Sequence, residues 1–211
     1  MLNDSLFSST SQHYATPGWV VPLVYKLFGG APCLDPASNP WSQVEASYRW
    51  TLRMTAWREL RRFTRKSGRF PSVSEAAGIR LVVQNYNRRS RLAGMLFRDA
   101  LGSPWPFVGF GYCNPPYDRV APFMHRVAGH AALYHSEWCC LVASRTSSSW
   151  WHESIFGSAS AVLYFRGRLS FQVFGKATGQ APFDSALVYY GARPRVFSDV
   201  FSSCGRVSLH P

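Results

Sequence analysis

The stretch Phe107-Val-Gly-Phe-Gly-Tyr-Cys-Asn-Pro-Pro-Tyr-Asp118 decides how the rest of this 211-residue sequence is interpreted. Its first part, Phe107 to Cys113, has the aromatic and small residues of a short buried strand. The prolines that follow fix φ at about −65° and remove two backbone donors, so a sheet ladder ends there. The sequence therefore predicts a polar amide, a free proline carbonyl and an aromatic ring at a strand's carboxyl end, where open α/β sheets bind ligands.

Asn114, Pro115, Pro116 and Tyr117 together resemble the catalytic motif of amino-methyltransferases that use S-adenosylmethionine. An adenine amino nitrogen is a poor nucleophile because its lone pair is delocalised into the ring. The resemblance implies that the Asn114 side-chain oxygen and the Pro115 carbonyl accept hydrogen bonds from that NH2 group and direct its lone pair at the methyl donor. It also implies that Tyr117 stacks on a base that has left the helix. The alternative is an ordinary strand-ending turn with a structural tyrosine.

A second block lies near the amino terminus. Thr16 is a candidate helix cap and Pro17 a candidate first helical residue. Apolar residues then recur at helical spacing as far as Gly29-Gly30. Residues 31–35 are predicted to form a short first strand, which turns out through Asp35-Pro36-Ala37-Ser38.

This block resembles the small phage and prophage DNA adenine methyltransferases of the Dam type, which begin with a Thr-Pro helix and a Leu-Asp-x-Ala strand end. The resemblance implies that Thr16 and Pro17 lie near the methionine end of the cofactor and that Asp35 faces its ammonium group or the neighbouring loop. The predicted cofactor-binding residues are Thr16, Pro17, Asp35, Pro36, Ala37 and Asn114. The sequence departs from the broader methyltransferase pattern, since Pro36, Ala37 and Ser38 stand where a glycine-rich turn is usual. Helix capping by Thr16 and turn formation by Asp35 are the alternatives.

Residues 45–99 form a compositional island. Thirteen basic and four acidic residues give the island a net charge of +9, of the chain's +12. Helical spacing of apolar residues from Trp50 to Leu60, followed by two more helical segments, predicts a basic helical insertion. We expect this insertion to be the DNA-recognition element, although a solvated basic face is the usual meaning of such a run. Its candidate DNA-binding residues are Arg53, Arg61, Arg62, Arg65, Lys66, Arg88 and Arg89.

A third block, residues 145–153, follows a predicted buried strand, Glu137–Ala143. The resembled family ends this strand in Arg-Thr-Asp-Thr-x-Trp-x-His or close variants, and Ser147 stands here where an aspartate is common. We expect a polar loop beside the Asn-Pro-Pro-Tyr loop and then a short helix. Arg145, Ser149, Trp151 and His152 are its candidate DNA-binding residues, Trp151 and His152 as walls of a base pocket.

The remaining chain supplies further predicted elements. Residues 120–132 are expected to form a helix, 160–165 and 185–190 strands, and 174–182 a loop. Residues 167–171 and 181–188 resemble the family's Gly-Arg-Leu-x-Phe and Ala-Pro-Phe-x-Ser-Ala-Leu-Val elements. Two adjacent terminal strands joined by a hairpin are expected to give the sheet an antiparallel edge. Residues 192–211 are expected to be a loosely ordered tail.

Composition excludes some classes of protein. There is no apolar run of about 18 residues and no basic-then-apolar leader, which argues against a membrane span or signal peptide. The odd number of cysteines, five, indicates reduced thiols and a cytoplasmic setting. His125, His130 and His135 are spread around a predicted helix and Cys139-Cys140 is no Cys-x-x-Cys pair, so no metal site is expected.

The sequence predicts an α/β, Rossmann-like S-adenosylmethionine-dependent methyltransferase sheet with an antiparallel edge hairpin and a basic helical insertion. We expect a flexible segment at 1–12, a catalytic domain at 13–44 and 100–191, the insertion at 45–99 and the tail at 192–211. The resemblance implies methylation of a flipped adenine in double-stranded DNA, encoded by a phage or prophage, with protection from restriction as the purpose. An amino-methyltransferase of RNA or of a protein glutamine, or an inactive DNA-binding protein on this scaffold, remain alternatives.

Overall fold

The computed structural model describes residues 14–38, 42–46, 48–49, 100–101, 105, 109–173 and 176–210. Their strands form two sheets, a large sheet of order β10-β6-β9-β5-β4-β2-β3 and a small sheet of order β1-β7-β8. The strands are β1 Tyr14–Ala15, β2 Leu34–Asp35, β3 Tyr48–Arg49, β4 Phe110–Cys113, β5 Glu137–Ala143, β6 Ala161–Phe165, β7 Ser170–Val173, β8 Lys176–Gln180, β9 Ser185–Tyr190 and β10 Gly205–Leu209. The α-helices are α1 Val20–Phe28, α4 Val120–Tyr134, α5 Ser149–Trp151 and α6 Pro194–Phe201, and α5 continues into a π-helical turn, His152–Phe156.

The large sheet is mixed, and its strand directions locate the site. β3, β2, β4 and β5 run parallel, whereas β9 lies antiparallel between β5 and β6. β6 therefore runs in the same direction as β5, and β10 pairs antiparallel with β6. The carboxyl ends of β2, β4, β5 and β6 consequently meet at one side of the sheet, here called the carboxyl edge.

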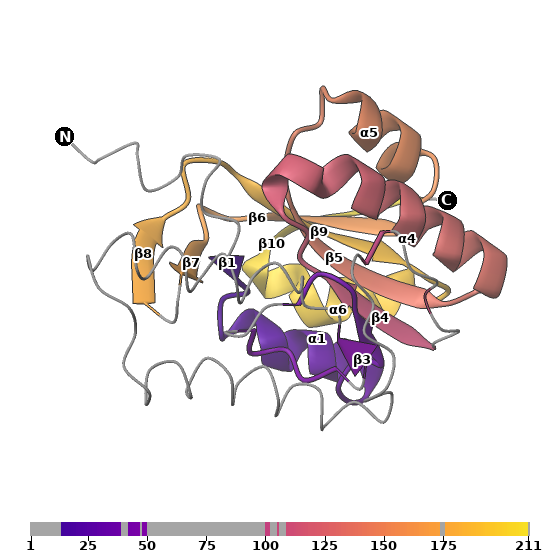
Figure 1. Ribbon diagram of the computed structural model, residues 1–211, viewed down its shortest axis with the longest axis horizontal. Helices are drawn as coiled ribbons and strands as arrows, with labels where there is room; N and C mark the ends of the chain where they lie inside the picture. The colour runs from indigo at the N-terminus through magenta and orange to yellow at the C-terminus, as the bar shows by residue number, and fades with distance from the viewer. Residues whose placement is uncertain are drawn as a thin grey trace, which may run out of the picture.

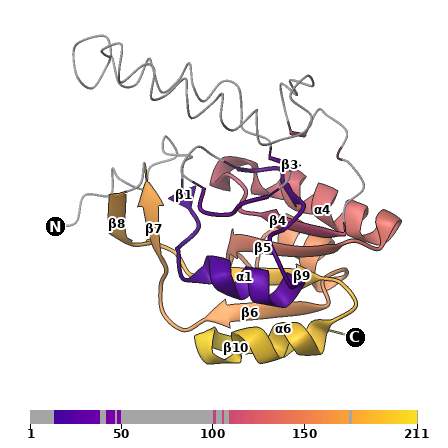
Figure 2. The same ribbon diagram turned by 90° about the horizontal axis from the view of Figure 1, so that it is seen from below.

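Helices cover both faces of this sheet (Figure 1). α4 and α5 pack on one face through Phe123, Met124 and Trp151, and α1 and α6 pack on the other through Val24, Phe197 and Phe201. Figure 2, in which the molecule is seen from below, shows α1 and α6 next to each other on the face of the sheet that is turned toward the viewer. The predicted mixed α/β fold is thereby confirmed.

Elements with strong local patterns have the predicted positions. β5 and β9 have the predicted bounds, because each is a continuous buried run with strands on both sides. α1 ends at Gly29, which adopts φ 74° and donates its backbone N–H to the Tyr25 carbonyl. α4 runs two residues further than predicted, to Tyr134.

The predicted antiparallel edge hairpin is wrong in its connections. β9 is interior rather than terminal, and it pairs with β6 although the β7–β8 hairpin separates them in sequence. The antiparallel strand at this end of the sheet is β10, which reaches β6 through α6. Residues 176–180, expected in a loop, form β8.

The prediction of a loosely ordered tail at 192–211 is also wrong. α6 buries Phe197, Val200 and Phe201, which lie on one helical face at spacings of three and four residues. At the opposite side of the sheet from the carboxyl edge, Arg193 donates to Glu137 with an Nη2–Oε2 distance of 2.7 Å. The segment is therefore part of the folded body.

Tyr48–Arg49 extends the large sheet beyond β2. These residues lie within the predicted insertion at 45–99, and they form β3 and pair with β2 in the large sheet. In the described part of the chain, no helix is long and apolar enough to cross a bilayer.

Candidate active site at the carboxyl edge

The Asn-Pro-Pro-Tyr segment leaves β4 directly at the carboxyl edge. Gly111 pairs with Trp138 and Cys113 with Cys140, so β4 is in register with β5 up to its last residue. The Pro116 carbonyl then accepts from the Arg119 amide at 3.0 Å and starts the turn that leads into α4. The Pro115 carbonyl accepts no hydrogen bond from any other described residue.

The Asn114 amide has a fixed orientation. Its Nδ2 donates to the Tyr14 carbonyl at 2.9 Å and lies 3.4 Å from the Thr16 Oγ1. A carbonyl oxygen can only accept, so the amide nitrogen must face Tyr14 and the side-chain oxygen must face the other way. Among the residues that the structure describes, none donates to that oxygen. Asn114 therefore presents an unused acceptor at the end of β4.

Thr16 is buried and does not cap α1, so the alternative in which it serves as a helix cap is wrong. α1 begins at Val20, and the Pro17 carbonyl accepts from the Val20 amide at 2.9 Å. The Thr16 Oγ1 instead lies 2.7 Å from the Tyr112 hydroxyl within the protein interior. Burial raises the pKa of Tyr112 well above its usual value. This pair ties the amino-terminal segment to β4 beside Asn114.

Asp35 ends β2 next to β4, with Leu34 in register with Gly111. Its side chain is buried, and its Oδ1 accepts from the Ala37 amide at 3.2 Å, which forms the predicted turn through Pro36. Burial raises the pKa of the Cys113 thiol, and the neighbouring Cys140 and Asp35 side chains raise it further. Asp35 thus lies close to the end of β4. The predicted strand at 31–35 is shorter, Leu34–Asp35.

Tyr117 is half-buried in an aromatic cluster of Tyr14, Tyr117, Phe171 and Phe183. Its ring centroid lies 4.6 Å from that of Phe183 and 5.1 Å from that of Tyr14, both edge to face. Burial raises the pKa of Tyr117, so its hydroxyl is neutral at physiological pH. The cluster joins the small sheet to the Asn-Pro-Pro-Tyr loop and holds the Tyr117 ring in place.

The third predicted block follows β5 at the same edge. Arg145 and Ser149 are exposed, and the Arg145 carbonyl accepts from the Ser148 hydroxyl at 2.6 Å. His152 is also exposed, and its ring packs edge-on against Phe156. Trp151 is instead fully buried in the core beneath α4, which leaves it no surface for DNA in this conformation.

The other predicted DNA-binding residues lie outside the described residues. They are Arg53, Arg61, Arg62, Arg65, Lys66, Arg88 and Arg89. No group of three or more His, Cys, Asp or Glu side chains suited to a metal occurs among the residues described. The five cysteines are all free thiols.

Sequence reasoning missed Tyr14, Tyr112 and Phe183 as parts of the site. Tyr14 acts through its backbone carbonyl, which carries no sequence signal. Tyr112 and Phe183 look like ordinary core residues in sequence, and only the spatial arrangement shows that they position Thr16 and Tyr117.

Comparison with known proteins identifies one family for part of the chain. Residues 95–188 match the family model described as DNA N-6-adenine-methyltransferase (Dam), which confirms the family resemblance. The match includes the Asn-Pro-Pro-Tyr segment and the block at 145–153. It leaves out Thr16, Asp35 and most of the basic island. No curated protein matches the chain. The family implies DNA adenine N6-methyltransferase activity, and such enzymes generally use S-adenosylmethionine.

Proposed function

We propose that this chain, whose residues 95–188 belong to the Dam family, methylates the exocyclic amino group of an adenine flipped out of duplex DNA. S-adenosylmethionine is the proposed methyl donor. The proposal extends to the fold, since the mixed sheet would be a Rossmann-like methyltransferase sheet with its ligands at the carboxyl edge. Asn114, Pro115, Pro116 and Tyr117 are the proposed catalytic segment.

The orientation of the Asn114 amide is the observation that carries the proposal. The bond from Nδ2 to the Tyr14 carbonyl leaves the side-chain oxygen free to accept from an adenine N–H. The Pro115 carbonyl next to it is a second free acceptor. Two preorganised acceptors favour the geometry in which the amino nitrogen carries a localised lone pair, so they stabilise the transition state more than the planar ground state.

Tyr117 has the proposed role of stacking on the flipped base. A base that leaves the helix loses its neighbours, and stacking on an aromatic side chain returns about 1–3 kcal/mol. The contacts with Tyr14 and Phe183 support this role, because they fix the ring before the base arrives. No strong base is proposed, since methyl transfer to an amine depends on positioning.

The residues at the carboxyl edge fit the proposed cofactor. The Ser144 hydroxyl, just after β5, is buried without a hydrogen-bond partner among the described residues, and Asn114 has an unused oxygen. Thr16, Pro17, Asp35, Pro36, Ala37 and Asn114 are the proposed cofactor-binding residues, and contacts within the structure bring Thr16 and Asn114 together. When bound, S-adenosylmethionine supplies an electrophilic methyl group on a positively charged sulfur.

The basic insertion at 45–99 is the proposed DNA-recognition element, in place of a separate domain. So small a recognition element is consistent with loose sequence specificity. Its net charge of +9 favours contact with DNA phosphates. Modified adenine confined to one sequence context would contradict loose specificity. We also propose that the enzyme acts in the cytoplasm of a bacterial host and is encoded by a phage or prophage.

The test is transfer of labelled methyl from S-adenosylmethionine to three substrates: unmethylated duplex DNA, RNA and protein. Labelled N6-methyladenine in the duplex alone is expected. Transfer to RNA or to glutamine alone would overturn the DNA assignment. Absence of cofactor binding, measured by titration, would leave an inactive DNA-binding protein.

A further inference from the structure

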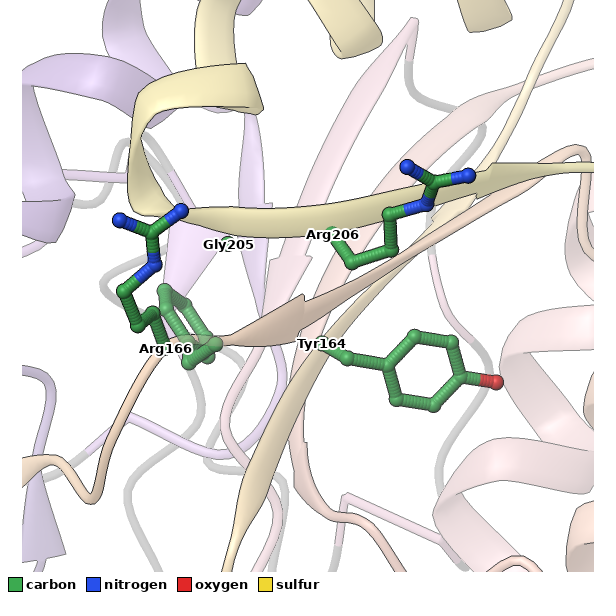
Figure 3. Close-up of a pocket in the computed structure, with 5 residues that line it drawn as sticks. Tyr164, Arg166, Gly205 and Arg206 are labelled. Carbon is green, nitrogen blue, oxygen red and sulfur yellow. The ribbon is translucent and has the colours of Figure 1, made fainter.

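A second set of exposed basic side chains lies at the carboxyl edge, away from the Asn-Pro-Pro-Tyr loop. β6 ends at Phe165 where β10 begins at Gly205, and an open pocket of about 430 Å³ lies between them. Its lining residues are Tyr164, Phe165, Arg166, Gly205 and Arg206. Figure 3 shows Arg166 and Arg206 on either side of Gly205, with the Tyr164 ring below Arg206.

The two arginines carry uncompensated charge. Both are exposed, and neither has an ion-pair partner among the described residues. Arg168, two residues along the same turn, pairs with Asp184 at 3.6 Å and is partly neutralised. Arg166 and Arg206 are therefore available to an external anion.

The strand pairing sets the position of these arginines. The Arg166 amide donates to the Cys204 carbonyl at 2.9 Å, and Arg206 is in register with Tyr164. A Cβ at Gly205 would lie 2.0 Å from the Tyr164 carbonyl oxygen, so only glycine allows the strands to approach this closely. Arg206 is consequently held on a paired strand, and Arg166, in the bend directly after β6, is held by its backbone bond to Cys204.

The chemistry of the pocket favours phosphate on a polymer. A small cofactor needs an enclosed, mainly apolar cavity, whereas this pocket is open and is flanked by two guanidinium groups. Guanidinium groups match phosphate oxygens in charge and in planar geometry. Trp19, 49% exposed, packs edge-on against the lining residue Phe165, so an exposed aromatic ring adjoins the pocket, and aromatic rings together with basic side chains are common in nucleic-acid grooves.

We infer that Arg166 and Arg206 bind backbone phosphates of the substrate duplex at a distance from the target adenine, in addition to the contacts proposed for the basic insertion. This inference rests on the proposed function. Because β4, β5 and β6 end at the same edge, a duplex engaged at Asn114 would extend along that edge toward β6 and β10. These contacts position the DNA and carry no base specificity.

The test measures duplex binding by fluorescence anisotropy from about 50 to about 200 mM salt, the range in which phosphate contacts are most evident. The variants are Arg166→Gln/Arg206→Gln together and, as a control, Arg195→Gln. Arg195 is an exposed arginine on α6, near the side of the sheet opposite the carboxyl edge. The Arg195→Gln substitution therefore removes a guanidinium charge of the same kind at a distant position. Equal melting temperatures establish that the variants are folded.

We expect the double variant to bind more weakly and its plot of log K against log salt to be shallower by about 0.9 for each lost phosphate contact. The control should retain the natural slope. If the natural protein methylates duplex DNA and the double variant keeps the natural slope, this inference is overturned and the proposed function stands. A natural protein that neither binds nor methylates duplex DNA would overturn both, and a loss seen with RNA alone would overturn the assignment to DNA.

Discussion

The side-chain nitrogen of Asn114 lies 2.9 Å from the carbonyl oxygen of Tyr14, 100 residues earlier in the chain. This bond determines which end of the amide faces outward, because the carbonyl cannot donate. The amino-terminal segment thereby fixes part of the geometry of the proposed catalytic segment, although it lies outside the matched family region. The amino terminus is therefore expected to matter for activity as well as for folding.

Thr16 and Tyr112 are expected to stabilise the site as a pair. Thr16→Val leaves the buried Tyr112 hydroxyl without its partner at 2.7 Å and should cost about 1–3 kcal/mol in the free energy of unfolding. The double variant Thr16→Val/Tyr112→Phe removes both polar groups and should recover part of that loss. Urea unfolding without cofactor measures both values, and additive losses would show that the two groups do not interact.

Tyr117→Ala should weaken binding to a duplex whose adenine lies opposite an abasic site by about 1–3 kcal/mol, because the stacking surface is lost. Tyr117→Phe should bind as the natural protein does, since the ring remains. The phenylalanine variant also controls for the cluster with Phe183, which it preserves. Equal binding by a folded Tyr117→Ala protein would rule out stacking.

Gly111 lies directly beside Trp138 on the neighbouring strand. A Cβ at this position would lie 2.4 Å from the Trp138 ring, which is fully buried and has little room to move. We expect Gly111→Ala to destabilise the protein by about 1–3 kcal/mol through overpacking. Gly109→Ala is the matched control, since no described atom lies within 4 Å of its added Cβ. Thermal unfolding of both variants makes the comparison, and equal melting temperatures would be inconsistent with a rigid Trp138.

The buried thiols should make the fold sensitive to alkali. Burial raises the pKa of Cys113, Cys139 and Cys140 above the ordinary value of 9.0. The folded state therefore holds these protons more tightly than the unfolded state, so stability is complete below about pH 9 and falls as the pH rises further. Each thiol contributes a slope of up to about 1.4 kcal/mol per pH unit.

Cys140→Ala provides the measurement for this prediction. Urea unfolding at several pH values above 9 should give a shallower decline for this variant than for the natural protein. Cys204→Ala, which removes a half-buried thiol with no hydrogen bond to buried groups, is the control. Identical declines in all three proteins would show that the Cys140 thiol does not titrate on unfolding.

The sequence predicted those parts of the fold that depend on local pattern. β5 and β9 have continuous apolar runs, and α1 ends at a glycine that takes the left-handed conformation. β8 and β10 were missed because each is short or mixed in composition and is stabilised by pairing with a distant strand. α6 was missed because its serine, arginine and aspartate residues obscure the spacing of Phe197, Val200 and Phe201.

The candidate site likewise contains residues that a local sequence pattern predicts and residues whose roles depend on distant contacts. Asn114 could be located at the end of a strand because the prolines after it end the ladder. The role of Thr16 depends on Tyr112, 96 residues away, and no local pattern shows that contact. Trp151 was expected to be a pocket wall because it lies in a short helix with aromatic sides after a polar loop, yet the turn of α5 directs it into the core.

The most direct test of the central claim is the formation of N6-methyladenine in duplex DNA by the natural protein and by Asn114→Ala, measured by mass spectrometry of the digested DNA. The natural protein should form N6-methyladenine, and Asn114→Ala should reduce the rate by about 100-fold or more, as expected for loss of a preorganised polar group at the reacting centre. The variant must retain cofactor binding and cooperative unfolding. A folded Asn114→Ala protein that methylates adenine at the natural rate would contradict the role assigned to the Asn-Pro-Pro-Tyr segment.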